Sequence, residues 1–151
     1  MKTKISMVDI TLKQVVFREA TVLGSIKLRP ETVKLIKKGS IEKGDPLETA
    51  KVAGIMAAKN TSQILPLCHP LPITVVKIET KIVGNDRVEV RSTVKAKAKT
   101  GVEMEALTAT SVSLLNIWDM VKKYEKDENG QYPHTQIIGI SVVKKVKEPN
   151  E

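Results

Sequence analysis

V-K-I-E-T-K-I-V-G-N-D-R-V-E-V-R-S-T-V-K-A-K-A, residues 76–98, alternates apolar and polar side chains on both sides of a turn. One face carries Val76, Ile78, Thr80 and Ile82 before the turn of Gly84, Asn85 and Asp86, and Val88, Val90, Val94, Ala96 and Ala98 after it. Because successive side chains in a strand point to opposite faces, this pattern predicts a β-hairpin with one face in the core. The other face is rich in lysine and arginine, and we interpret it as a solvated sheet face rather than a binding surface.

Two short helices are predicted before the hairpin. Pro30 is a favourable first helical residue, and Gly39 ends the helix that it begins. Asp45 is a good N-cap for the second helix, Pro46 follows it, and Glu48 has the spacing of a capping box. The body of the second helix is rich in alanine and contains a glycine. These small residues indicate close packing against another element, and the alternative is a plain core helix.

The elements after and around the hairpin complete the architecture. Thr100 and Glu103 have the spacing of a capping box, so we expect a long helix from there to about Tyr124. Residues 15–28 and 137–146 are rich in β-forming side chains and predict a first and a last strand.

The order of these elements is strand, two helices, hairpin, helix, strand. It predicts one domain over residues 1–151 with an α+β architecture, a ferredoxin-like sandwich in which an antiparallel sheet carries its helices on one face. Gly24 lies within the first strand, where we expect a β-bulge.

Composition restricts the possible partners. The 151 residues carry a net charge of +8, which suits an anionic ligand, yet only 3% of them are aromatic. Binding of single-stranded nucleic acid usually needs several aromatic stacking platforms, so a small polyanion is favoured over nucleic acid. No apolar run approaches the roughly 20 residues of a membrane span, so no membrane partner is expected. The single cysteine excludes an internal disulfide and predicts a cytoplasmic protein.

L-P-L-C-H-P-L-P, residues 65–72, is the second informative stretch. Its three prolines exclude a helix and predict a stiff, extended loop. This loop presents Cys68 and His69, a thiol and an imidazole, in fixed directions. A binding site explains the pairing, and so does a buried proline-rich crossover in which the thiol is a small apolar group. The residues alone leave both interpretations open.

Polar residues of the long helix are candidates for chemistry. Glu103 and Glu105 flank Met104 in its first turn, and Asp119 and Lys122 form an i, i+3 pair near its end. A lysine beside a carboxylate can be adapted for acid–base catalysis. Spacing alone favours an ordinary surface ion pair. One cysteine and two histidines at unrelated spacings do not make a zinc site, so no metal site is predicted.

Three ungapped motifs extend this interpretation. They are L-P-L-C-H-P-L at 65–71, K-T-G-V-E-M-E-A-L-T-A at 99–109 and W-D-M-V-K at 118–122. Together they resemble the molybdenum cofactor biosynthesis protein C family, the cyclic pyranopterin monophosphate synthases, and the similarity covers nearly the whole chain.

The resemblance implies a function and an assembly. The family converts a cyclised dihydroguanosine triphosphate, derived from GTP, to cyclic pyranopterin monophosphate and releases pyrophosphate, which makes it a phosphorus–oxygen lyase. It implies no cofactor. It also implies a homohexamer, a trimer of dimers, with active sites at subunit interfaces.

The resemblance also assigns residues. Asp119 and Lys122 match the catalytic pair of the D-M-x-K segment. The positions that match substrate-binding residues are Leu67, Cys68, His69, Glu103, Met104, Glu105, Lys43, Arg18 and Lys145. Lys144 is an alternative to Lys145 on the last strand, and Lys145 is favoured.

Two other hypotheses compete with the synthase. One is a basic α+β module that binds RNA or a nucleotide without catalysis, and it predicts strongly salt-dependent binding to oligonucleotides. The other is a non-catalytic oligomeric scaffold. The intact D-M-x-K and L-C-H-P segments count against the scaffold.

Overall fold

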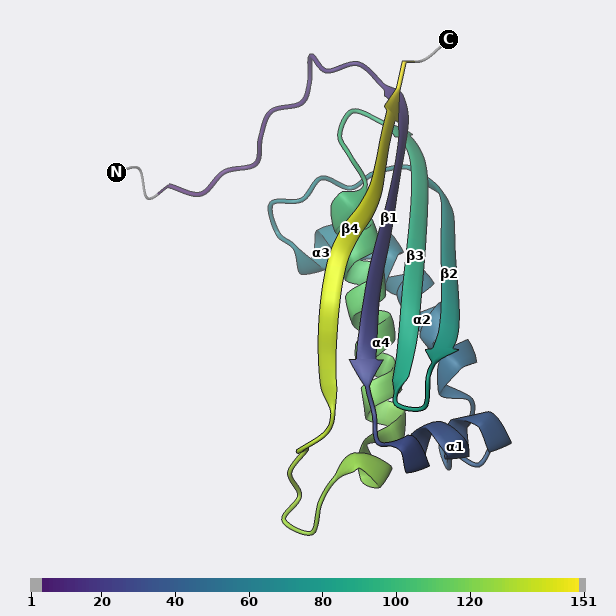
Figure 1. The fold of residues 1–151 in the computed structure, drawn as a ribbon. Helices are drawn as coiled ribbons and strands as arrows, with labels where there is room; N and C mark the ends of the chain where they lie inside the picture. Colours follow the sequence, from purple (N-terminus) through teal and green to yellow (C-terminus); the bar gives the residue numbers. More distant parts are fainter. Residues whose placement is uncertain (1–3, 150–151) are drawn as a thin grey trace.

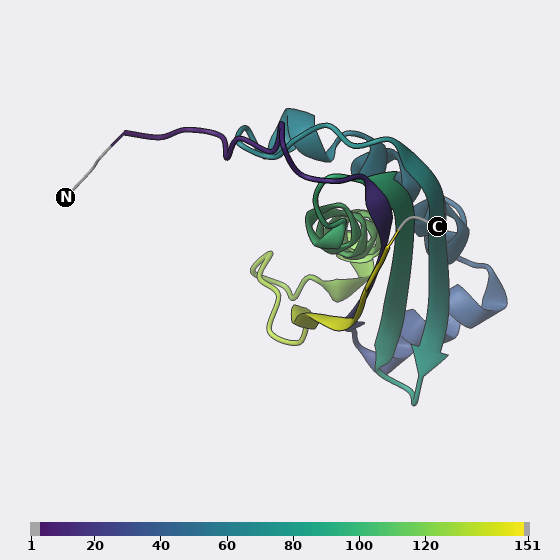
Figure 2. The same ribbon diagram turned by 90° about the horizontal axis from the view of Figure 1, so that it is seen from above.

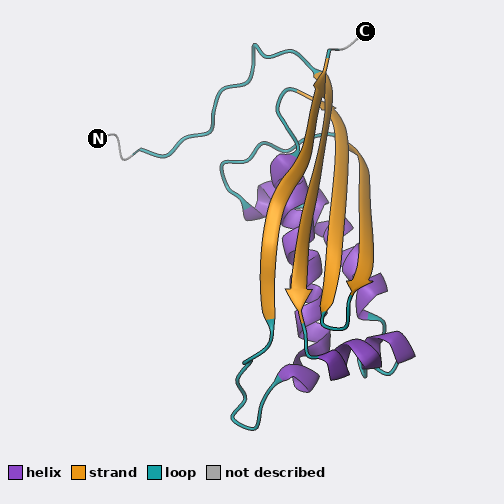
Figure 3. Cartoon of the chain, viewed as in Figure 1, coloured by secondary structure: helices purple, strands orange, loops and turns teal. Residues whose placement is uncertain are grey.

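The computed structural model describes residues 4–149, and these form one antiparallel sheet with helices packed on one of its faces (Figures 1 and 3). In chain order the elements are β1 (Val16–Lys27), α1 (Pro30–Lys38), α2 (Pro46–Lys59), α3 (Thr61–Ile64), β2 (Ile73–Val83), β3 (Arg87–Ala98), α4 (Glu103–Glu125) and β4 (Gln136–Glu148). Seen from above, the helices lie on one side of the sheet (Figure 2).

The strands are arranged in the order β2-β3-β1-β4. The predicted hairpin is the β2–β3 pair, and β1 lies between β3 and β4, antiparallel to both. The expected α+β, ferredoxin-like sandwich is therefore confirmed. The short helix α3 was not predicted, because T-S-Q-I is too short to show a helical period.

The core lies between the sheet and α4. Val88, Val90 and Val94 of β3 are fully buried, whereas Arg87 and Arg91 on the opposite face are exposed. The inner face of α4 packs on these valines through Ala106, Ala109, Leu114, Ile117 and Val121. The alternation in residues 76–98 thus selects the face of the sheet that the helices cover.

Glycines mark the places where helices approach other elements most closely. A Cβ atom built on Gly54 of α2 would collide with the side chain of Ser113 on α4, which confirms the predicted tight packing of the second helix. A Cβ atom on Gly24 would lie 2.9 Å from Ile140 and 3.0 Å from Leu114. The predicted bulge is displaced: the pairing of β1 with β4 shifts between Leu23 and Ser25, and the extra residue belongs to β4.

The helix ends follow the sequence signals in part. Gly39 ends α1 in the left-handed conformation at φ 68°, and Asp45 caps α2 by accepting from the backbone N–H groups of Leu47 and Glu48. The capping box predicted for Thr100 is wrong. Helix α4 begins at Glu103 behind Val102, without a side-chain cap, because the Glu103 carboxylate pairs with a lysine of β4 instead.

The far end of α4 is fixed by a buried carboxylate. Glu125 is fully buried and accepts from the backbone N–H of Arg29 at 3.1 Å and from the Thr135 hydroxyl at 2.7 Å. It also accepts a hydrogen bond from Thr32. One side chain therefore joins α4 to the start of α1 and to the loop before β4. In the described part of the chain, no helix has the combined length and apolarity of a membrane span.

Candidate active site

The predicted site residues fall into two groups at opposite ends of α4. The loop group comprises Leu67, Cys68 and His69 with Glu103, Met104 and Glu105 at the start of α4, and Arg18 and Lys145 lie at the same end. The lysine group comprises Lys43, Asp119 and Lys122. Each group is held by several elements, so the fold brings together residues that are distant in sequence.

The loop group borders a cavity of about 550 Å³. Leu67, Cys68 and His69 form one wall, and Glu103 and Met104 form another. A cavity of this size is in the range that binds small molecules. The proline-rich stretch is thus a partly exposed wall, not a buried crossover.

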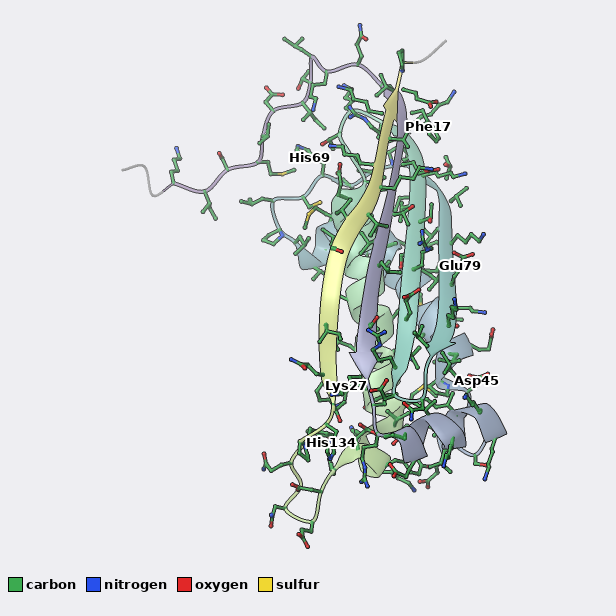
Figure 4. The ribbon with its side chains drawn as sticks, in the orientation of Figure 1. Phe17, Lys27, Asp45, His69, Glu79 and His134 are labelled. Atoms are coloured by element: carbon green, nitrogen blue, oxygen red, sulfur yellow. The ribbon has the colours of Figure 1, made fainter. Side chains whose placement is uncertain are left out.

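The segment before β1 forms a third wall that the site predictions missed. Val8, Ile10 and Lys13 line the same cavity. The Val8 carbonyl accepts from His69 Nε2 at 2.8 Å, and Lys99 Nζ donates to the Thr11 carbonyl at 3.0 Å. Figure 4 shows His69 directed toward this segment. An irregular segment has no periodicity, so its role could not be predicted from local pattern.

Cys68 faces a carboxyl group rather than the imidazole. Its Sγ lies 3.8 Å from Glu105 Oε2, while His69 is bound to Val8, so the two neighbours do not form a nucleophilic pair. Burial, followed by the charge of Glu105 and the hydrogen bond to it, raises the pKa of the Cys68 thiol. Burial also raises the pKa of Glu105. In both groups, burial disfavours the charged form.

Glu103 is held by the last strand. Lys145 Nζ lies 2.7 Å from Glu103 Oε1, whereas Lys144 pairs with Glu19 on the uncovered face of the sheet. Burial alone would raise the pKa of Glu103, but the hydrogen bond from Lys145, a backbone hydrogen bond and the positive charges of Lys145 and Arg18 together outweigh burial and leave the pKa below its usual value. This geometry favours Lys145 over Lys144 as the lysine of the site.

Arg18 is buried under the same end of α4. It is only 5% exposed, and its guanidinium donates to the carbonyl oxygens of Ala98 at 3.4 Å and Lys99 at 3.2 Å. Those carbonyls belong to the turn that leads into α4. In this arrangement Arg18 positions the turn, and its positive charge contributes to the lowered pKa of Glu103.

The lysine group is centred on Asp119. Its carboxylate oxygens lie 3.0 Å from Lys43 Nζ and 2.9 Å from Lys122 Nζ. The hydrogen bonds from Lys122 and Lys43 lower the pKa of Asp119, and the bond to Asp119 raises the pKa of Lys122. All three side chains are about half exposed and border a cavity of about 210 Å³. Two ammonium groups on one carboxylate suit an anionic ligand.

Supporting contacts of the lysine group were also missed from the sequence. The backbone N–H of Glu42 donates to the Tyr124 hydroxyl at 2.9 Å, and the Glu42 carboxylate pairs with Lys123. The Lys123 ammonium lies 5.3 Å from the Tyr124 ring centre. These contacts hold the loop before α2 against α4 and so present Lys43 to Asp119. Glu42 is about 80 residues from both Tyr124 and Lys123, so local spacing in the sequence could not predict these contacts.

Within one protomer, the loop group and the lysine group lie far apart. Glu105 and Lys122 lie 17 residues apart on one straight helix, which at 1.5 Å per residue separates them by about 25 Å along its axis. Among residues 4–149, no cluster of histidine, cysteine and carboxylate side chains could hold a metal ion. The two ends of α4 thus present separate groups of charged side chains.

The fold and the two groups of charged side chains together define a basic protein of the ferredoxin-like α+β class. Residues 7–148 match the sequence model of the MoaC family, so the chain belongs to the MoaC family.

Named relatives agree over nearly their whole length. A relative from Sulfurisphaera tokodaii is 59% identical over 145 residues, which cover 96% of this chain and 95% of the relative. One from Pyrococcus horikoshii is 60% identical over 97% of this chain and 91% of its own. One from Saccharolobus solfataricus is 59% identical over 98% of this chain and 99% of the relative. Each bears the name "Probable cyclic pyranopterin monophosphate synthase".

Proposed function

We propose that this chain is a cyclic pyranopterin monophosphate synthase of molybdenum cofactor biosynthesis, a phosphorus–oxygen lyase. Its substrate is the cyclised dihydroguanosine triphosphate derived from GTP, and its products are cyclic pyranopterin monophosphate and pyrophosphate. The observation that carries the proposal is family membership over residues 7–148, together with relatives of this name at 59–60% identity.

The loop group suits the ring system of such a substrate. Leu67 and Met104 are exposed apolar side chains on the wall of the large cavity and can cover a planar ring. His69 and the carboxylate of Glu103 offer directed hydrogen bonds beside them. Small-molecule sites usually have a mostly apolar lining with a few polar groups.

The lysine group suits the polyphosphate and the proton transfers. A substrate hydroxyl attacks the α-phosphorus, a new P–O bond closes the cyclic monophosphate, and the bond to pyrophosphate breaks. Lys43 and Lys122 stabilise the negative charge that develops on the leaving group. Lys122 is the main acid–base group, and Asp119 orients it. The raised pKa of Lys122 favours the ammonium, so its action as a base requires burial that lowers this pKa.

A complete site then requires more than one protomer. The 25 Å between Glu105 and Lys122 along α4 is too long for one substrate-sized cavity within a chain, so the loop group of one protomer combines with the lysine group of another. We assign the family's homohexamer, a trimer of dimers, to this chain. Exposed apolar side chains support an assembly, and they include Val52, Met56, Leu115, Val142 and Val143.

The remaining parts of the proposal are chemical. The rearrangement transfers no electrons, so no redox cofactor takes part, and the protein works in the cytoplasm on a soluble nucleotide derivative. The basic surface attracts the triphosphate rather than a nucleic acid or a membrane.

The decisive experiment is incubation of the full chain with the cyclised GTP intermediate, with pyrophosphate and the pterin product measured together. We expect equal amounts of both. Absence of product, combined with oligonucleotide binding that weakens steeply with salt, would favour the nucleic-acid module instead. A stable monomer in sedimentation experiments would contradict a site built between protomers.

A further inference from the structure

Glu105 leaves one carboxyl oxygen without a partner inside the protein. Its side chain is only 2% exposed, and Oε2 lies 3.8 Å from Cys68 Sγ. Oε1 is buried and makes no hydrogen bond with any residue between 4 and 149. Buried polar atoms are nearly always paired, with ordered water where protein groups are lacking. Glu105 Oε1 therefore needs a hydrogen-bond partner.

A small cavity adjoins this carboxyl group. Its volume is about 50 Å³, and its lining includes Glu105, His69 and the hydroxyl-bearing Thr61 and Ser62. It is distinct from the 550 Å³ cavity, whose walls include His69 but not Glu105. A polar cavity of this size has room for water, which needs two to four hydrogen-bond partners.

His69 separates the two cavities, since its side chain borders both. A carbonyl oxygen can only accept, so the 2.8 Å contact with Val8 makes Nε2 the donor and requires a proton on it. In the neutral ring, Nδ1 is then an acceptor. One imidazole nitrogen is fixed by the segment before β1, and the other is available to a second partner.

We propose that the small cavity holds ordered water that bridges the unpartnered oxygen of Glu105 to Nδ1 of His69. The bridge makes Glu105 a positioning residue for the His69 ring, through which it acts on the substrate. Only the last clause rests on the proposed function, because the bridge itself exists in the substrate-free protein. A water molecule can donate one hydrogen to Glu105 Oε1 and the other to His69 Nδ1, because both atoms can accept.

Groups on every side of Glu105 are consistent with this bridge. Cys68 of the loop already occupies Oε2, and Glu103 on the same helix is turned toward Lys145. Lys59 of α2 also lines the small cavity but forms no ion pair with Glu105. No direct hydrogen bond joins Glu105 to His69 among residues 4–149, and both residues line the small cavity, where water can lie between them.

The first test is a high-resolution crystal structure of the full chain without substrate. We expect a water molecule within hydrogen-bond distance of both Glu105 Oε1 and His69 Nδ1. An empty small cavity, or a Glu105 carboxyl group turned into the large cavity, would overturn the proposal.

The second test follows the imidazole directly by ¹⁵N NMR. The chain has two histidines, so Glu105→Gln can be compared with the native chain once His134→Gln has assigned the spectrum. His134 lies at the opposite end of the molecule and serves as an internal control (Figure 4). We expect Glu105→Gln to shift the Nδ1 resonance of His69 and leave that of His134 unchanged. An unchanged His69 resonance would show that no bridge exists.

A cavity-filling variant separates water from other effects of Glu105. Ala58 is buried and lines the small cavity, so Ala58→Val expels water while the carboxyl group remains. We expect the same shift of Nδ1 as with Glu105→Gln. If Ala58→Val shifts nothing, water does not carry the coupling. If that variant fails to fold, Ser62→Ala, which removes a hydroxyl from the wall, replaces it. The crystal structure and the NMR shifts do not need turnover, so their results test the bridge independently of the synthase activity.

Discussion

Lys145 Nζ lies 2.7 Å from Glu103 Oε1, and this ion pair joins the last strand of the sheet to the first turn of α4. The pair lies at the edge of the 550 Å³ cavity, because Glu103 lines it. It explains why the expected capping box does not form, since the carboxylate that would have closed the box is engaged by β4. The same contact distinguishes two adjacent lysines that the sequence could not rank from local pattern.

Exchange of each lysine for methionine tests this distinction. In Lys145→Met, Glu103 loses its cation, and we expect kcat/KM for the cyclised substrate to fall by at least tenfold. Lys144→Met removes a side chain of similar exposure that pairs with Glu19 on the other face of the sheet, and its kcat/KM should stay within twofold of the native value. Equal losses in both variants would contradict the assignment.

Removal of Lys122 tests the acid–base role. We expect Lys122→Ala to lack measurable turnover while circular dichroism and sedimentation remain native, because the side chain is half exposed and its ion pair adds little stability. Lys126→Ala, four residues further along the chain, is the matched control and should remain active. Substantial product from Lys122→Ala would remove the proposed role.

The Tyr124 hydroxyl holds the loop that presents Lys43, because it accepts a hydrogen bond from the backbone N–H of Glu42. In Tyr124→Phe the backbone N–H of Glu42 loses its 2.9 Å partner, and the loop that presents Lys43 is held less firmly. One lost hydrogen bond is worth about 1 kcal/mol, or about fivefold in an equilibrium or rate constant. We expect a loss of this size in kcat/KM at constant pH optimum. Tyr132→Phe changes the other tyrosine and should have no effect, so a similar loss there would argue against this explanation.

Glu125 offers a test of stability separate from catalysis. Glu125→Ala leaves the buried Thr32 and Thr135 hydroxyls and the Arg29 N–H without their acceptor. Buried donors without partners cost about 1–3 kcal/mol each, so we expect the free energy of unfolding in urea to fall by about 3 kcal/mol or more. Glu125→Gln keeps one acceptor oxygen and should lose less. Equal losses would indicate that packing, not hydrogen bonding, dominates.

The sequence predicted those parts of the fold that rest on local pattern. The hairpin over 76–98 follows from alternation, and Gly39 and Asp45 mark helix ends by backbone chemistry. The capping box at Thr100 failed because a contact with β4, about forty residues away, competes for Glu103. Local rules give the conformation that a residue favours, and a distant partner can outweigh them.

Motifs predicted the candidate site residues, but they did not predict how these residues are arranged. Motifs singled out Cys68, His69 and Lys122, but nothing local shows that the first two lie at one end of α4 and the third at the other. The wall formed by Val8 depends on a backbone contact, which any side chain at position 8 could provide. Such contacts leave no residue-type signal in a single sequence.

The thiol of Cys68 provides the last prediction, a pH dependence. Because burial and the adjacent Glu105 raise the pKa of Cys68, the thiolate fraction at pH 8 is smaller than that of an unperturbed cysteine, and alkylation by iodoacetamide should be slower than for a model thiol. The rate should rise with pH until the raised pKa is passed. Glu105→Gln removes a negative neighbour, so the pKa should fall and alkylation at pH 8 should become faster. A slower or unchanged rate in Glu105→Gln would show that burial alone controls the thiol, and that the 3.8 Å contact between the two side chains contributes nothing to its ionisation.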